Sequence, residues 1–368
     1  MGDKNARFVP GLRGNHRVSI DAAPQLRSKI SNSVVLARLG MATVDEKRYV
    51  VGVQYQPKDL RPMQLWEAIR RPEYLLNPRQ IWRRLRRRSR CARNAIRLSW
   101  GLPIEVHPKS HVGLDIINIG VYDKVVAEAI CRLSDPGEAA FDIGANIGQN
   151  VSIMALAVSP GGSVFAFEPG PTAWEMLTRN VESWAAYDLA PITIVRKGLS
   201  SRIGEGLLRE SLDLGGFSLE DQAPSEVMIS PEHNRAIKVE LTTLDAFVSE
   251  QPAQIGLIKI DVEGHELAVL EGSKRILEQR LVRDIVFEDF CAQPSPVTLF
   301  LQAAGYEVLA LLPTRRKPIL LTLEQLSEWR RQGYDPPNFL ATLDPDRARA
   351  RFDSAGWKCL RLRAKLVT

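Results

Sequence analysis

The 368-residue chain has few cysteines and lacks long apolar runs. Its four cysteines lie at least 40 residues apart and form no CxxC pair, which argues against a zinc knuckle or a thioredoxin-like site. Widely spaced single cysteines fit a reducing compartment. The first residues lack the apolar core of a signal peptide, and no apolar run approaches the roughly 20 residues that span a bilayer. We therefore expect a cytoplasmic protein.

Opposite charges gather in two parts of the chain, although the whole carries a net charge of only +6. Residues 1–110 hold 23 Lys and Arg and 8 Asp and Glu, a net charge of +15. The remaining residues hold 26 Lys and Arg and 35 Asp and Glu, a net charge of −9. A basic first part joined to an acidic body indicates separate roles for the two.

The most basic segment is 79–97, which contains nine arginines and no acid. It lies in a predicted helical region, 63–100, with a partial apolar stripe, and two strands are predicted before it, at 34–45 and 47–57. One interpretation is a solvated helix, or one packed on the acidic body. A second is a helix on an anionic membrane surface, which would place the protein peripherally at the inner face. A nucleic acid partner is the least favoured interpretation.

After Gly101 the sequence alternates between apolar strands and amphipathic helices. Such alternation predicts an α/β fold with a mostly parallel, doubly wound sheet and helices on both faces. Residues 200–243 break the rhythm and predict a hairpin. In these sheets ligands bind at the carboxyl ends of the strands. The predicted strands are 139–144, 163–169, 192–197, 255–261, 283–289, 306–312 and 338–343, and the predicted helices are 120–134, 147–159, 172–184, 265–279 and 298–305.

The first predicted strand of the alternation ends in a glycine turn that begins at Asp142. Gly144 and Gly148 permit a tight turn with close backbone approach to a ligand, and the next helix presents free N–H groups. Asp142 lies where a carboxylate can meet an ammonium group or order a water molecule. The GxxxG spacing differs from the GxGxxG of NAD-binding domains, which disfavours a dehydrogenase. An ordinary strand–helix turn without a ligand remains the alternative.

Further acids stand at two other strand ends. Glu168 follows the second strand, where an acid can accept both ribose hydroxyls of an adenosyl ligand, although a plain surface glutamate is the alternative. Asp261 ends the fourth strand, and Glu263 and His265 follow it on the same rim. Asp261 and Glu263 can orient the amino group of a cofactor, and His265 can take a proton. For His265, a residue near a helix N-terminus without a catalytic task is the alternative. The three side chains are also compatible with a divalent ion, but nothing requires one, and we expect no metal.

Four motifs, FDIGANIGQN, FAFEPGP, LIKIDVEGHELAVLEGS and IVFED, resemble in this order the FkbM-type S-adenosylmethionine-dependent methyltransferases. The resemblance covers about residues 110–310 and implies a Rossmann-like class I fold with S-adenosyl-L-methionine as cofactor. It implies that the loop from Asp142 to Gly148, with Gly144 and Asn146, holds the methionine part and that Glu168 holds the ribose. It also implies that Asp261 and Glu263 lie beside the methyl group.

The resemblance implies O-methylation of a hydroxyl on a sugar, glycan or natural product. In-line transfer to a hydroxyl needs a group that takes the proton, so Asp261, Glu263 and His265 are the catalytic candidates. The pKa of an unperturbed histidine suits this task at neutral pH. A non-catalytic Rossmann-like module, tethered by the arginine segment to membrane or nucleic acid, is the rival hypothesis. The intact glycine turn and Glu168 argue against such a degenerate module, and an NAD-dependent oxidoreductase is a weaker third hypothesis.

The motifs divide the chain into three predicted parts. Residues 1–109 form a basic N-terminal extension of undefined role, 110–345 the methyltransferase domain, and 346–368 a C-terminal tail. The sequence specifies neither the methyl acceptor nor the oligomeric state.

Overall fold

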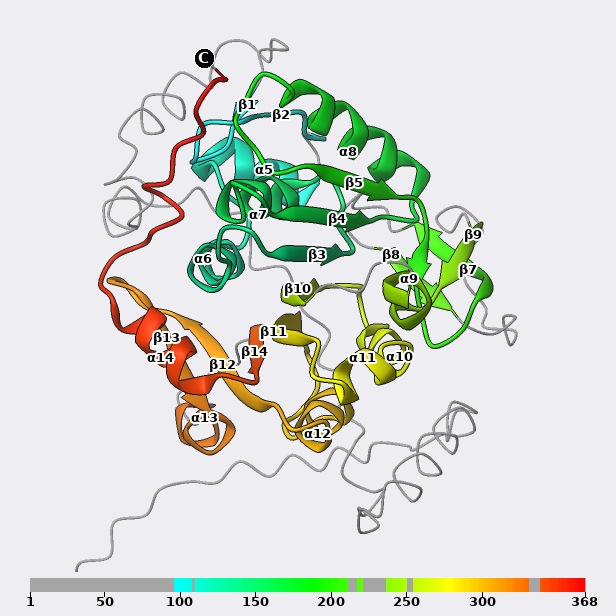
Figure 1. The fold of residues 1–368 in the computed structure, drawn as a ribbon, viewed down its shortest axis with the longest axis vertical. Coiled ribbons are helices and arrows are strands. Elements are labelled where there is room, and N and C mark those ends of the chain that lie inside the picture. The colour runs from blue at the N-terminus through cyan, green and yellow to red at the C-terminus, as the bar shows by residue number, and fades with distance from the viewer. Residues whose placement is uncertain are drawn as a thin grey trace, which may run out of the picture. The chain divides into compact units, whose positions relative to one another are not determined.

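The computed structural model describes residues 96–107, 110–210, 217–220, 236–249, 254–330 and 338–367 (Figure 1). The strands predicted before residue 60, the helix predicted from residue 63 and nearly all of the arginine segment lie outside the described residues. No helix in the described ranges is long and apolar enough to cross a membrane.

The fold is organised around an eight-stranded sheet with the order β13-β12-β14-β11-β10-β3-β4-β5. Strands β11, β10, β3, β4 and β5 pair in parallel, while β14, β12 and β13 form an antiparallel edge. The predicted mostly parallel sheet is therefore confirmed. The bounds are β3 Ala139–Ile143, β4 Ser163–Phe167, β5 Ile192–Val195, β10 Ile255–Ile260, β11 Val282–Glu288, β12 Glu307–Pro313, β13 Pro318–Thr322 and β14 Asn338–Thr342.

Helices cover both faces of this sheet (Figure 1). Alternate residues of a strand point to opposite faces, so Ala140 packs in one hydrophobic core and Phe141 in the other. Two separate cores result, as the doubly wound prediction requires. The first contains residues of α5 His111–Ile119, α6 Lys124–Leu133, α7 Gln149–Ala157, α8 Pro171–Ser183 and α14 Pro345–Asp353. The second contains residues of α9 Leu244–Ser249, α10 Glu266–Glu271, α11 Lys274–Glu278, α12 Pro296–Ala303 and α13 Leu323–Arg330.

A smaller four-stranded sheet, with the order β6-β9-β7-β8, interrupts the alternation between β5 and β10. Its strands β7 and β9 pair antiparallel from Gly204 opposite Leu241 onward, so the predicted hairpin is confirmed. The sheet supplies Leu208 to the cleft described below. The bounds are β6 Gly198–Leu199, β7 Gly204–Glu210, β8 Phe217–Glu220 and β9 Ala236–Thr242.

The single helix predicted over 265–279 is wrong, because two short helices, α10 and α11, occupy this range. They meet at Gly272 and Ser273, where the backbone of Ser200 approaches closely. A Cβ at position 272 would lie 2.0 Å from the carbonyl oxygen of Ser200. This close approach leaves no room for a side chain at position 272, and it separates the two helices.

Residues on both sides of the predicted domain boundaries pack in the first core. Trp100 follows the short strand β1 Ile96–Arg97, which pairs with β2 Pro103–Ile104, and its Nε1 donates to Ser152 Oγ at 2.9 Å. Trp357, beyond α14, is also buried in this core. The boundaries at 109/110 and 345/346 stay predictions, and the described flanks share one core with the sheet.

Candidate active site

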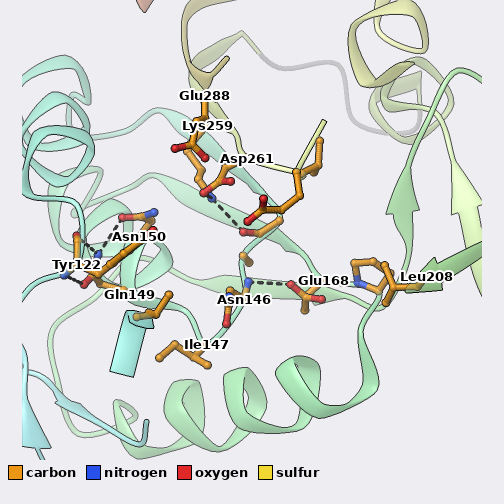
Figure 2. Close-up of a pocket in the computed structure, with 16 residues that line it drawn as sticks. Tyr122, Asn146, Ile147, Gln149, Asn150, Glu168, Leu208, Lys259, Asp261 and Glu288 are labelled. Carbon is orange, nitrogen blue, oxygen red and sulfur yellow. Dashed lines mark hydrogen bonds and ion pairs between the residues drawn. The ribbon is translucent and has the colours of Figure 1, made fainter. Parts of the chain in front are cut away.

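A cleft opens at the carboxyl ends of the parallel strands (Figure 2). Its volume is about 800 Å³, including the opening to solvent. The chain runs from β3 to β4 on one side and places β10 on the other side of β3, so strand order reverses at this point. Ligands of doubly wound folds bind at such a reversal. The lining residues are Val112, Tyr122, Gly144, Ala145, Asn146, Ile147, Gln149, Asn150, Glu168, Pro169, Leu208, Lys259, Asp261, Val262, Glu263 and Glu288.

Gly144 begins the turn that forms one wall of the cleft. Its φ is 78°, and a Cβ at this position would lie 1.9 Å from the carbonyl oxygen of Asp261. Both strain and space therefore demand glycine. The N–H groups of Gly144 and Ala145 donate to the carbonyl oxygen of Phe167, each at 3.0 Å. The turn is thus held against both β4 and β10.

Glu168 is buried at the end of β4, with 3% of its surface exposed. Its two carboxylate oxygens accept from the backbone N–H groups of Asn146 and Gly170, each at 2.8 Å. Figure 2 shows the contact with Asn146. Burial raises the pKa of Glu168 to about 7, although these two hydrogen bonds lower it. Each oxygen keeps a further lone pair that can accept from a hydroxyl. The geometry therefore suits the ribose role predicted for this residue.

Lys259 lines the cleft and is a residue that the sequence prediction missed. It belongs to β10, and only 3% of its surface is exposed. Its Nζ lies 3.2 Å from Asp142 Oδ1 and 3.4 Å from Asp261 Oδ2, and it donates to the Gly144 carbonyl oxygen at 3.0 Å. Burial alone would lower the pKa of Lys259, but Asp142 and Asp261 together outweigh it and raise the pKa. A lysine inside the apolar strand sequence IGLIKI was the available signal.

Asp142 is fully buried behind Lys259 and does not line the cleft. Burial raises the pKa of its carboxyl group, and the charge of Lys259 opposes that shift. Its strand position is directly opposite Lys259 in the register of β3 and β10. A direct contact between Asp142 and the methionine part of a cofactor stays a prediction. The structure gives this carboxylate a cation from the protein itself.

Gly148 and Asn146 have different positions in the predicted cofactor loop. Asn146 lines the cleft in a left-handed conformation with φ 47°, which asparagine tolerates. Gly148 does not line it and lies at the start of α7, where a Cβ would be 2.6 Å from Leu177 Cδ1. The observed role of Gly148 is therefore close packing of α7 against α8.

Three acids line the cleft at the ends of β10 and β11. Glu263 is exposed, and partial desolvation with the charges of Asp261 and Glu266 raises its pKa to about 7, a shift that solvent partly screens. Glu288, which the sequence prediction missed, hydrogen-bonds to Asp261. Burial, with the charges of Asp261, Asp123 and Glu263, raises the pKa of Glu288 to about 10. Carboxyl groups that hold protons near neutrality are therefore concentrated on this wall.

His265 lies apart from these acids. It precedes α10, is 8% exposed, and its Nε2 lies 3.0 Å from Ser200 Oγ, on the side of the small sheet. It is not among the residues that line the cleft. The structure thus brings Asp261 and Glu263 together in the cleft, whereas a catalytic role for His265 stays a prediction without geometric support.

Further residues of the lining come from segments far away in the sequence. Gln149 fixes the loop before α6, because its Oε1 accepts from Tyr122 N at 2.5 Å and its Nε2 donates to the Tyr122 carbonyl oxygen at 2.8 Å. Val112 of α5 and Leu208 of β7 add apolar side chains to the lining. Leu208 lies on the side of Glu168, across the cleft from Tyr122 (Figure 2). Gln149 belongs to the motif FDIGANIGQN, but no motif marked Val112 or Leu208, which reach the cleft only through the chain topology.

The chain matches a known family model over this region. The methyltransferase FkbM domain matches residues 142–308. The hexuronic acid methyltransferase AglP of Haloferax volcanii is 31% identical over 187 residues, 49% of this chain and 67% of the relative. The 31-O-demethyl-FK506 methyltransferase FkbM of Streptomyces tacrolimicus is 31% identical over 199 residues, 48% of this chain and 75% of the relative.

Solved structures show only distant likeness. A SAM-dependent O-methyltransferase from Thermotoga maritima has a TM-score of 0.33 at 15% identity, with 63% of this chain and 71% of that chain covered. The precorrin-6y C5,15-methyltransferase of Geobacter metallireducens has a TM-score of 0.32 at 15% identity, with 60% and 87% covered.

Proposed function

The chain belongs to the FkbM methyltransferase family, and we propose that it methylates a hydroxyl group on a sugar, glycan or natural product. S-Adenosyl-L-methionine is the methyl donor of this family. The names of two relatives support the acceptor class, since one acts on a hexuronic acid and the other on the 31-O position of a demethylated natural product.

The observation that carries the proposal is that one cleft contains both the glycine turn and the strand-end acids. Gly144, Asn146 and Glu168 form one side of it, and Asp261, Glu263 and Glu288 another. A group bound on the first side and an acceptor on the second would meet within the same cleft. Methyl transfer requires this kind of shared positioning.

The residues of the first side fit the donor. The turn at Gly144 has no room for a side chain, which permits close backbone approach by a ligand. The buried Glu168 keeps acceptor positions for the two hydroxyls of a ribose. When bound, the donor supplies an electrophilic methyl group. The chain contributes the orientation and the exclusion of water.

The acids of the second side would receive the proton of the acceptor hydroxyl. General bases work best when their pKa lies near the working pH, and the pKa of Glu263 is raised to about 7. Asp261 follows β10 beside the turn and is held by Lys259. We therefore assign proton acceptance to Asp261 or Glu263 rather than to His265.

The test is a mass-spectrometric comparison of metabolites and glycans from cells with and without the protein. We expect one class of hydroxylated compound to lose a mass of one methylene when the protein is absent. The same compound, incubated with purified protein and methyl-labelled S-adenosylmethionine, should gain the label on oxygen. Label on nitrogen or carbon would overturn O-methylation, and no label on any acceptor class would overturn the methyltransferase proposal.

A further inference from the structure

Lys259 contacts three parts of the site with one ammonium group. An ammonium has three donors, and the three oxygens near it belong to buried Asp142, to Asp261 in the cleft and to the backbone of Gly144. Two of these three partners line the cleft. A lysine that only neutralised Asp142 would need neither of the other contacts.

The elements that carry these partners differ. Asp142 lies in β3, Gly144 follows β3 in the turn, and Asp261 follows β10. In the pocket view, Lys259 lies between the acid wall and the turn (Figure 2). The ammonium therefore links the donor side of the cleft to the acid side.

We propose that Lys259 is a positioning residue: its ammonium ties the Asp261 carboxylate to the Gly144 turn and so fixes the acids relative to the donor site. The proposal rests on the function proposed above. Lys259 acts through Asp261 and Gly144.

The charge of Lys259 also acts on the neighbouring acid. The groups that set the pKa of Glu263 are Asp261 and Glu266, which raise it together with desolvation, and Lys259, which lowers it. Removing the ammonium therefore raises the pKa of Glu263 further above 7. A loss of side-chain packing alone would not raise the pKa of Glu263 in this way.

The test compares Asp142→Asn with Asp142→Asn/Lys259→Met. The single variant keeps the ammonium with its Asp261 and Gly144 contacts, and the double variant removes the ammonium without stranding a buried carboxylate. Carboxyl ¹³C NMR follows the titration of Glu263, assigned through Glu263→Gln. Calorimetry measures binding of S-adenosylhomocysteine, which needs no acceptor.

Relative to the single variant, we expect the Glu263 midpoint of the double variant to rise. Affinity for S-adenosylhomocysteine should fall about tenfold, the scale of one lost charge-assisted hydrogen bond. A double variant that titrates and binds like the single variant, with only a lower melting temperature, would overturn the positioning role.

A second double variant, Asp142→Asn/Lys259→Gln, guards against misfolding and separates charge from hydrogen bonding. Its amide can still donate to the Gly144 carbonyl, so we expect affinity within about threefold of the single variant. The Glu263 midpoint should nevertheless rise, because the charge is gone. An unshifted midpoint in this variant would also overturn the proposal.

The outcomes distinguish this inference from the proposed function. A wild-type protein that binds no S-adenosylhomocysteine would refute the donor assignment, while the Glu263 titration would still report on Lys259. If all variants bind S-adenosylhomocysteine normally and the Glu263 midpoint does not shift, only the role of Lys259 is refuted.

Discussion

Acidic side chains at the two ends of the parallel strands differ in their cationic partners. At the amino end, Arg347 pairs with Asp135 at 2.5 Å and with the buried Asp284 at 3.0 Å. Arg283 pairs with Asp284 as well, at 2.9 Å, and with Glu138. Arginine suits such sites because its planar fork can bind two carboxylates at once. Each of these acids has a cation within direct contact.

At the carboxyl end, most acidic side chains have no lysine or arginine partner among the described residues. Glu168, Asp261, Glu263 and Glu288 line the cleft, and among its lining residues in the described part of the chain Lys259 is the one Lys or Arg. The pKa of Glu168 is raised to about 7 by burial. The pKa of Asp135 at the other end is lowered, because hydrogen bonds and charges from Arg347 and Arg351 outweigh its desolvation.

This difference separates stability from function. Paired acids at the amino end hold α14 against the start of the sheet, as the contacts of Arg347 show. Acids kept protonated or poorly compensated at the carboxyl end are typical of sites that bind ligands or move protons. Substitutions at the first end should therefore change unfolding, and substitutions at the second should change binding and turnover.

The largest expected effect is on turnover in Asp261→Asn. Loss of a proton acceptor typically lowers the rate by about 10²–10⁴-fold, and Asp261 lines the cleft beside the turn. The assay uses the acceptor identified by mass spectrometry. His265→Ala is the matched comparison, with a small loss expected because its ring faces Ser200. Near-normal turnover in a folded Asp261→Asn protein would move the active centre away from β10.

At the opposite end, Arg347→Met should destabilise the fold without changing ligand affinity. The variant removes the contacts of Arg347 with Asp284 and Asp135, while Asp284 keeps its pair with Arg283, so we expect a loss of about 3 kcal/mol, the upper end for a hydrogen bond to a charged group. Urea unfolding measures the loss. Arg349→Met is the control, because the pair of Arg349 with Glu307 is largely exposed and worth less than about 1 kcal/mol. Equal losses in both variants would contradict the special role of the amino-end pairs.

Glu168 at the carboxyl end and Asp135 at the amino end should also respond to pH with opposite signs. The folded pKa of Glu168, about 7, lies above its ordinary value of 4.5. The contribution of Glu168 to folding stability is therefore fully present below pH 4.5. It is lost as pH rises through 7, which lowers the free energy of unfolding by about 3 kcal/mol. For Asp135, whose pKa is lowered, stability is instead lost as pH falls.

Urea unfolding of the unliganded protein from pH 4 to pH 8 measures this response. The wild type should lose stability relative to Glu168→Gln over that interval, since the variant has no carboxyl group to ionise there. Parallel stability curves for the two proteins would show that Glu168 does not titrate near neutrality.

The smallest expected effect is on donor affinity in Glu168→Gln. The substitution keeps the size of the side chain but halves its capacity to accept hydroxyl hydrogen bonds. A lost charge-assisted hydrogen bond costs about 1.5–3 kcal/mol, so affinity for S-adenosylhomocysteine should fall about ten- to a hundredfold. Calorimetry at pH 8 measures it, and unchanged affinity would refute the ribose assignment.

The sequence predicted the parts of the site that lie at strand ends. Asp261, Glu263 and Glu168 each follow an apolar strand, and parallel strands bring their carboxyl ends to one edge. Glu288 likewise ends the strand β11, so the same rule could have predicted it as a site residue. Lys259 was missed because its signal, one charge inside a buried strand, does not indicate which partners surround it.

Other parts depend on tertiary contacts that no local pattern encodes. The division of α10 from α11 depends on the approach of Ser200 to Gly272. Leu208 reaches the cleft only because the small sheet is folded toward it. The position of His265 outside the cleft lining likewise depends on its contact with Ser200, since sequence proximity to Asp261 suggested the opposite.

The most direct test of the donor assignment is calorimetric titration of the 368-residue chain with S-adenosylhomocysteine and, separately, with NAD. We expect binding of S-adenosylhomocysteine in the micromolar range, about −8 kcal/mol, and no detectable heat with NAD. Binding of NAD without binding of S-adenosylhomocysteine would contradict the assignment of this cleft to a methyl donor.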